Sequence, residues 1–261
     1  SEKDLAEQMG YFTGINALWR TSGLFLGALC HDVLGFAATF IGLGILSLLS
    51  LPLGRQSQKR RERTDRHAGA GREQQGTWSF VCFGIVMGLV GGGMIFSTLG
   101  LVVKTHFGDT VSVAGFAVGA ATVTGFVMGM RQFMDGLGGP VFGALMDRMG
   151  RKRAIGWLFL SGSGLLFLVG FQSTLLGLVA LIILYFVCAT ALYTVLYAQA
   201  GQSGPRAVAS FATAMDLGMS IGPMIGWGIA QFEFPLSTIF ATSASFYAVG
   251  AAVAFLTLER R

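Results

Sequence analysis

The 261-residue chain has little charge, few prolines and few of the residues that bind metals. Only 12% of its residues are charged, about half the share usual in soluble globular proteins. Its three cysteines, Cys30, Cys82 and Cys188, lie in separate apolar runs, so neither a disulfide nor a metal site is expected. None of the three histidines has a second ligand at metal-binding spacing. No H-E-x-x-H motif occurs, which argues against a metalloprotease-type enzyme, and we expect neither an enzyme nor a cofactor.

Apolar residues are correspondingly abundant. They make up 53% of the chain, and the mean hydropathy is +0.65. A soluble protein of this length cannot bury so much apolar surface, so lipid is the expected surrounding for most of the chain.

The basic residues are distributed very unevenly. Of 18 Lys and Arg, seven lie in 55–72 and four in 148–153. If the chain crosses a membrane repeatedly, fifteen of the 18 fall on one side and only Lys104 falls in a loop on the other. This asymmetry places the basic side, with both ends of the chain, in the cytoplasm of a bacterial-type inner (plasma) membrane. Binding to nucleic acid is not expected, because no aromatic residues are interleaved with the basic ones.

The apolar runs predict an all-α membrane protein with about eight transmembrane helices. Each run is close to the roughly 20 residues that cross a bilayer, and no dyad alternation favours strands. The hydrophilic stretch 54–77 predicts a cytoplasmic linker that separates two helices from six. The expected helices are 10–31, 34–53, 78–103, 112–136 (continuing to Met146), 154–171, 174–198, 207–231 and 236–257.

One short turn between two of these runs carries an unusual concentration of charge. Residues 143–155 read Gly-Ala-Leu-Met-Asp-Arg-Met-Gly-Arg-Lys-Arg-Ala-Ile, which gives the pattern G-x-L-x-D-R-x-G-R-K-x-x-I. This pattern resembles the cytoplasmic loop signature of the major facilitator superfamily of secondary transporters. The resemblance implies a gating loop, in which the signature Asp docks on the start of a helix from the other half, here near Gly10–Gly14. The residues that it assigns to this loop are Gly143, Asp147, Arg148, Gly150, Arg151 and Lys152.

An internal repeat extends the resemblance along the chain. Arg20-Thr21-Ser22-Gly23-x3-Gly27 aligns with Met215-Asp216-Leu217-Gly218-x3-Gly222 at an offset of 195 residues. Parallel repeats of this kind are typical of the same superfamily. The chain then corresponds to helices five to twelve of a twelve-helix transporter. Residues 1–53 would end the N-terminal half and 78–261 would form the six-helix C-terminal half. Helices one to four are then missing partners, and the alternative is a natural eight-helix protein.

Four charged residues within the apolar runs are candidates for ion coupling or substrate binding. Arg131 and Asp135 are spaced i, i+4 and are predicted to pair, since each alone would cost about 2.5–3.5 kcal/mol at a helix centre. Asp216 lies about 15 Å into its helix with no basic residue within a turn, so it should be neutral or face a water-filled cavity. Arg20 could share that cavity or contact an anionic substrate.

A glycine- and proline-containing segment is a candidate point of helix flexure. Gly218-Met-Ser-Ile-Gly222-Pro223-Met-Ile-Gly226 is similar to the family's antiporter signature, G-x-x-x-G-P-x-x-G. The family carries that signature in helix five, where this chain has Ala28 in place of the proline. The spacing of Gly218, Gly222 and Gly226 also predicts close approach of a neighbouring helix.

These patterns predict a secondary transporter, or permease, that moves a small solute by alternating access and is coupled to protons. The alternative is a non-transporting membrane scaffold or sensor on the same fold. The substrate, the direction of flux (uptake or efflux) and the coupling ion do not follow from the sequence. Arg20 and Arg131 suit an anion, whereas Asp216 suits a cation or a proton.

Overall fold

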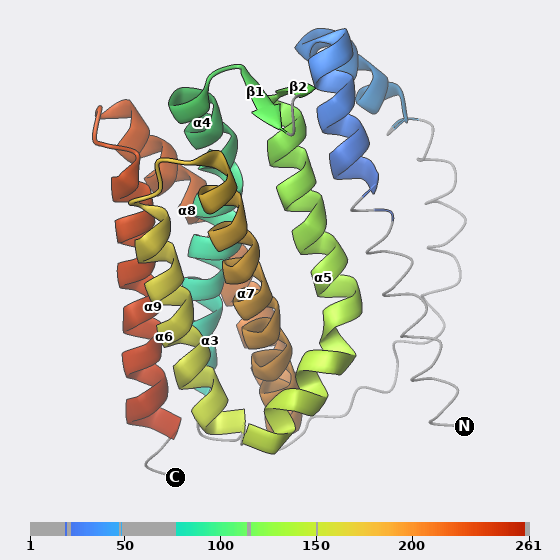
Figure 1. The fold of residues 1–261 in the computed structure, drawn as a ribbon. Coiled ribbons are helices and arrows are strands. Elements are labelled where there is room, and N and C mark those ends of the chain that lie inside the picture. Colours follow the sequence, from blue (N-terminus) through green and yellow to red (C-terminus); the bar gives the residue numbers. More distant parts are fainter. Residues whose placement is uncertain are drawn as a thin grey trace.

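The computed structural model describes residue 19, residues 22–46 and 48, and residues 77–113, 116–149 and 151–258. These residues form eight helical segments and one β-hairpin (Figure 1). The segments are helix Ser22–Leu34, helix Phe36–Leu46, a long helix composed of α3 (Thr77–Met87), η2 (Gly88–Ile95) and α4 (Phe96–Phe107), the strands β1 (Thr110–Val113) and β2 (Phe116–Gly119), α5 (Ala120–Met149), α6 (Arg151–Val169), α7 (Leu175–Ser203), α8 (Pro205–Gln231) and α9 (Ser237–Leu258). The predicted helical architecture is confirmed, and the linker predicted at 54–77 lies, apart from Thr77, outside the described residues.

Four of the helices are long and apolar enough to cross a membrane, by length and composition. They are Trp78–Phe107, Leu175–Ser203, Arg206–Gln231 and Ser237–Thr257. Helices Ser22–Leu34, Phe36–Leu46 and Arg153–Val169 are apolar but shorter. Many large apolar side chains on the bundle surface are exposed, including Trp78 and Leu176, both at 81%. A surface of this kind is typical of a protein that contacts lipid. The chain therefore has membrane-protein character, with four candidate spans among the described residues, which omit parts of the first two predicted helices.

The expectation that the chain contains no strand is wrong at one place. β1 and β2 pair antiparallel, with Thr110 opposite Gly119 and Val113 opposite Phe116. The sequence Thr-Val-Ser-Val before residues 114–115 is rich in β-branched residues, which favour strands. The argument against strands applies to sheets that face lipid, and this hairpin lies between the ends of α4 and α5 instead (Figure 1). It delays the start of the fourth predicted helix from residue 112 to Ala120.

Glycine sets two other helix boundaries. Gly35 has a φ of 82° and separates the first two helices, slightly later than the predicted loop at His31-Asp32. Gly204 has a φ of 109° and separates α7 from α8, and Pro205 follows at the first turn of α8. Left-handed φ values favour glycine, and proline is well suited to a first helical turn. As a result, α7 and α8 both extend into the segment predicted to be the loop that carries Arg206.

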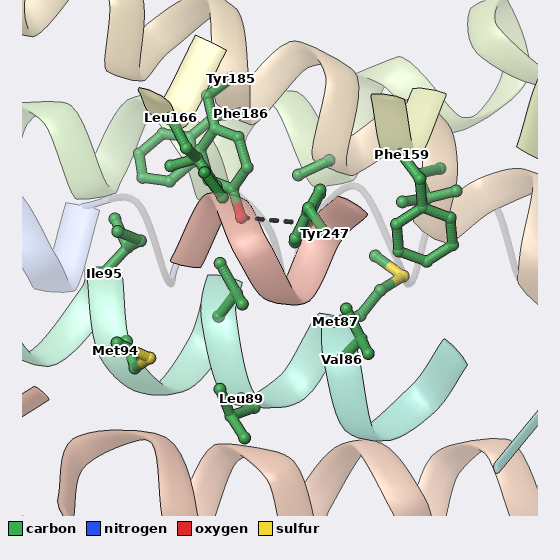
Figure 2. Close-up of a cluster of buried hydrophobic side chains, with 14 of the residues drawn as sticks. Val86, Met87, Leu89, Met94, Ile95, Phe159, Leu166, Tyr185, Phe186 and Tyr247 are labelled. Carbon is green, nitrogen blue, oxygen red and sulfur yellow. Dashed lines mark hydrogen bonds between the residues drawn. The ribbon is translucent and has the colours of Figure 1, made fainter. Parts of the chain in front are cut away.

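The interior of the bundle is a cluster of aromatic and aliphatic side chains where α3, α6, α7 and α9 meet (Figure 2). Phe159 packs against Tyr247 with ring centroids 5.3 Å apart, and Tyr247 packs against Tyr185 at 5.5 Å. All three side chains are fully buried. The Tyr185 hydroxyl donates a hydrogen bond to the Tyr247 hydroxyl at 3.0 Å, so neither phenol is left without a polar partner.

The tightest contact between helices joins the π-helical segment η2 to α8. A Cβ atom added to Gly93 would lie 2.6 Å from the Cα of Gly222. On the other helix, Gly218 and Gly222 would likewise place a Cβ against the backbone of Leu89 and Gly93. The close approach predicted from the glycine spacing is therefore confirmed. Backbone contact of this kind provides van der Waals packing where lipid gives no hydrophobic drive between helices.

Helix Ser22–Leu34 packs against the start of α5 through a carboxylate cap. Asp32 Oδ2 accepts hydrogen bonds from the backbone N–H of Thr122, at 2.9 Å, and from its hydroxyl. Gly119 provides the space, because a Cβ there would collide with the Asp32 carboxylate. A negative charge beside the first turn of a helix is favourable, so Asp32 stabilises α5 from outside that helix.

We predict that Gly222→Ala lowers the stability of the protein by about 1–3 kcal/mol, because the new methyl group meets rigid backbone. Gly228→Ala in the same helix is the matched control, since nothing lies within 4 Å of its added Cβ. That control should be neutral, or stabilising by up to about 1 kcal/mol through helix propensity. Thermal unfolding of both variants in one detergent measures the difference, and equal midpoints would contradict the packing argument.

We also predict that the contact of Asp32 with α5 depends on pH. Partial burial acts to raise the pKa of Asp32, but the hydrogen bonds from Thr122 and His31 outweigh it, and the pKa lies below its ordinary value of 3.8. The carboxylate therefore supports the contact at all pH values above 3.8 and loses this effect as the pH falls through the lower, folded-state pKa. Hydrogen exchange at the Thr122 amide should be slow at neutral pH and fast in Asp32→Asn. Glu233→Gln, which removes an exposed carboxylate between α8 and α9, should leave that amide unchanged.

Candidate functional site

Arg131 lies inside the bundle and reaches from α5 to the π-helical segment. Its Nη1 donates a hydrogen bond to the backbone carbonyl of Gly91 at 2.6 Å. The guanidinium carbon lies 5.2 Å from the ring centroid of Phe186 and 6.0 Å from that of Phe96. Only 17% of the side chain is exposed. The cation is thus held by a carbonyl dipole and two aromatic faces, which replace part of the water that it would have in solution.

Asp135 completes the charge balance of this site. Its Oδ2 lies 3.7 Å from Arg131 Nε, one helical turn away, as the i, i+4 spacing predicts. Its other oxygen, Oδ1, accepts a hydrogen bond from the hydroxyl of Thr190 on α7. The carboxylate is 33% exposed, so one side of it remains accessible from outside the bundle. The separation of 3.7 Å is at the long end of an ion pair, whereas the bond from Arg131 to Gly91 is short.

Two buried tyrosines extend this polar region into the core. The position of an added Cβ on Gly91 lies 3.4 Å from both the Tyr185 hydroxyl and Arg131 Nη2. Glycine at this position therefore lets the guanidinium and the phenol approach the helix axis. Figure 2 shows Tyr185 pointing toward Tyr247, with the hydrogen bond between their hydroxyls. The polar groups of α5, η2, α7 and α9 thus meet in one region of an otherwise apolar bundle.

The other charged candidate, Asp216, lies elsewhere. It is on α8 and is exposed, next to Leu217, which is 52% exposed. Among the described residues its carboxylate has no hydrogen-bond or ion-pair partner, and only its backbone carbonyl accepts a bond, from Ser220. The structure therefore does not bring Asp216 together with the Arg131–Asp135 pair in one hydrogen-bonded cluster. Arg20, which was predicted to share a cavity with Asp216 or to contact an anionic substrate, lies outside the described residues.

The predicted gating loop is described only in its backbone. Gly143, Asp147 and Arg148 lie in the last turns of α5, and Arg151 and Lys152 begin α6. The helix boundary thus falls where the loop signature places its turn. Gly150 and the side chains of the other five residues lie outside the described residues, so the docking of Asp147 on another helix remains a prediction.

The predicted flexure segment has a definite neighbour. Gly218 and Gly222 contact η2, and a Cβ on Gly226 would lie 2.8 Å from the Thr98 methyl group of α4. Pro223 is inside α8, next to this contact. The glycines are therefore occupied in packing against the long α3–η2–α4 helix, and any flexure at Pro223 would have to move that helix as well.

Sequence reasoning did not identify three components of the site. Thr190 gives no signal in the sequence, because it is 55 residues from its partner Asp135. The carbonyl of Gly91 is a backbone group, and the only signal in the sequence of this segment is the run of three glycines, Gly91-Gly92-Gly93. The π-helical geometry of η2 could not be read from hydropathy, because the segment is apolar all round. Among the described residues, no three His, Cys, Asp or Glu side chains gather in a group that could hold a metal ion.

No protein-family model matches this chain, and no curated protein matches it significantly.

We predict that the Arg131–Asp135 pair contributes little to the free energy of unfolding and instead helps to specify how the helices pack. Arg131→Met should destabilise the protein by about 1–3 kcal/mol, because it leaves a carboxylate in a low-dielectric region without its cation. The double variant Arg131→Met with Asp135→Leu should recover most of that loss, since apolar replacements of a buried pair are often neutral. Thermal unfolding of the single and double variants tests this. Additive losses would show that the two residues do not act as a pair.

Proposed function

We propose that this protein is a secondary transporter that moves a small solute across a membrane by alternating access, with proton coupling through Asp135. The Arg131–Asp135 pair is the observation that carries the proposal. Ionisable residues within apolar helical bundles are costly and most often mark an ion or substrate path. Buried ion pairs often contribute little net stability, so a role in function would account for the presence of this one.

The geometry of the pair suits reversible proton binding. Asp135 is partly exposed, so a proton can reach it, and Arg131 lies close enough to respond to its charge. Protonation of Asp135 would remove the attraction at Nε and leave Arg131 to its short bond with Gly91. After deprotonation, the Asp135 carboxylate would again compete with the Gly91 carbonyl for the Arg131 guanidinium. A change of one charge is thereby linked to contacts on a different helix, which is the essential element of coupling.

Several sequence features support the same proposal. The loop pattern at 143–155 resembles the signature of the major facilitator superfamily, and the offset repeat agrees with two halves of similar design. The basic residues gather on one predicted side, as in proteins of the bacterial inner membrane. Under this proposal the loop containing Asp147 acts as the cytoplasmic gate, and Asp216 is a second carboxylate available to the transport path.

The proposal is tested with the chain reconstituted in liposomes that contain a pH-sensitive dye. A panel of anionic, cationic and neutral solutes is added outside, with and without an imposed pH gradient. At least one solute should cause a change in internal pH in the wild type. Asp135→Asn should reduce that rate at least tenfold, because the amide cannot exchange the proton.

Two further variants make the result specific. Asp109→Asn removes a carboxylate that is 76% exposed in the hairpin region, and it should leave the rate unchanged. Asp216→Asn determines whether the second carboxylate takes part. If no solute moves protons in the wild type, or if Asp135→Asn transports at the wild-type rate, proton coupling through this site is wrong.

A further inference from the structure

The long helix from Thr77 to Phe107 changes its winding in the middle. α3 is α-helical, η2 is π-helical over eight residues, and α4 returns to α-helical winding. Stretches of π-helix are uncommon, usually a single turn, and are often found at functional sites. Three successive glycines, Gly91, Gly92 and Gly93, lie within η2.

The π winding determines which glycine faces α8. Gly88 and Gly93 both pack against the α8 backbone, at Met215 and Gly222 respectively. They are five residues apart, which is the span of one backbone hydrogen bond in a π-helix. In an α-helix, residues five apart point in different directions, at about 100° per residue, and residues four apart share a face. With α winding after Gly88, Gly92 would therefore take the position of Gly93 against Gly222.

The sequence accommodates both arrangements. Gly92 and Gly93 both lack a side chain, so either can lie against Gly222. Beyond η2, the buried residues of α4 include Val102 and Val103. A shift by one residue would put Leu101 and Val102 in those two places, and both are apolar. The buried Thr98 and Leu99 would be replaced by Ser97 and Thr98, whose hydroxyls already bond within the helix to the Met94 carbonyl.

Arg131 supports the π form. Its hydrogen bond ends on the carbonyl of Gly91, in the middle of η2. A side chain that bonds to a mid-helix carbonyl draws that carbonyl away from the helix axis and competes with the regular ladder of hydrogen bonds. The aromatic faces of Phe96 and Phe186 keep the guanidinium at this position.

We propose that η2 is a switch with two windings, in which Arg131 holds the π form and its withdrawal lets the segment rewind as α-helix and turn α4. Rewinding removes one residue from the turn and rotates α4 by about 100°. The use of this rotation in transport rests on the function proposed above, whereas the two windings themselves do not.

Substitutions at adjacent glycines separate the two windings. Gly93→Ala places a methyl group 2.6 Å from the Cα of Gly222, so it disfavours the π form. Gly92→Ala meets the Met219 side chain in the π form, with Cγ and Sδ at 2.6 Å, and would meet the Gly222 backbone after rewinding; a side chain can move aside more easily than backbone. Gly92→Ala therefore disfavours the α form. The two variants make the same chemical change one residue apart, and each is the control for the other.

The experiment measures the distance between spin labels at His106 on α4 and Leu176 on α7, both of which are exposed. Cys30, Cys82 and Cys188 are replaced by serine, and the full chain is placed in lipid nanodiscs without solute. Wild type and Gly92→Ala should give one shared distance. Gly93→Ala and Arg131→Met should give a second distance, displaced by several ångströms, because α4 has turned about an axis within a helix about 10–12 Å across.

Arg131→Met with Asp135→Leu is included so that loss of stability does not obscure the result, and it should also show the second distance. Circular dichroism confirms that each variant is helical. Wild-type distances in folded Arg131→Met and in the double variant would overturn the switch, as would identical distances in Gly92→Ala and Gly93→Ala. The measurement requires no transport, so a failure of the proposed proton coupling would be seen separately, in the liposome assay.

Discussion

The backbone-to-backbone contact between η2 and α8 is the constraint on which the rest of the structure depends. Glycines on both helices bring the two main chains so close that a single methyl group at Gly93 or Gly222 would collide with backbone atoms. In the observed π winding, Gly88 and Gly93 both lie against α8. It also orients the Gly91 carbonyl toward α5, where Arg131 binds it. Packing and charge are therefore arranged around the same few glycines.

The features that could be predicted from the sequence are those with a local cause. Long apolar runs predicted most of the helices between Trp78 and Leu258, and the i, i+4 spacing predicted that Arg131 and Asp135 would pair. The spacing of Gly218 and Gly222 predicted a close helix contact, although not its partner. In each case the responsible residues lie within one or two turns, so helical periodicity alone is enough to bring them together.

The features that could not be predicted depend on contacts between distant parts of the chain. Thr190 is 55 residues from Asp135, and Thr122 is 90 residues from Asp32. The π winding of η2 determines which glycine meets α8, and this winding is invisible in the hydropathy of an apolar segment. The hairpin was missed because its β-branched residues continue an apolar run, and length alone made that run look helical. The roles of Asp147, Arg148 and their neighbours stay predictions carried by the loop pattern.

The β1–β2 hairpin has a mechanical consequence. It joins the end of α4 to the start of α5 with only Gly108 and Asp109 before β1 and none between β2 and Ala120. The carboxylate of Asp32 accepts a hydrogen bond from the first turn of α5, at Thr122, and lies beside Gly119. Because these connections are so short, a rotation of α4 would be transmitted through the paired strands to the hydrogen bonds between Asp32 and Thr122. If α4 turns as proposed above, the hairpin would therefore carry the movement from the centre of the bundle to the contact with helix Ser22–Leu34 at its edge (Figure 1).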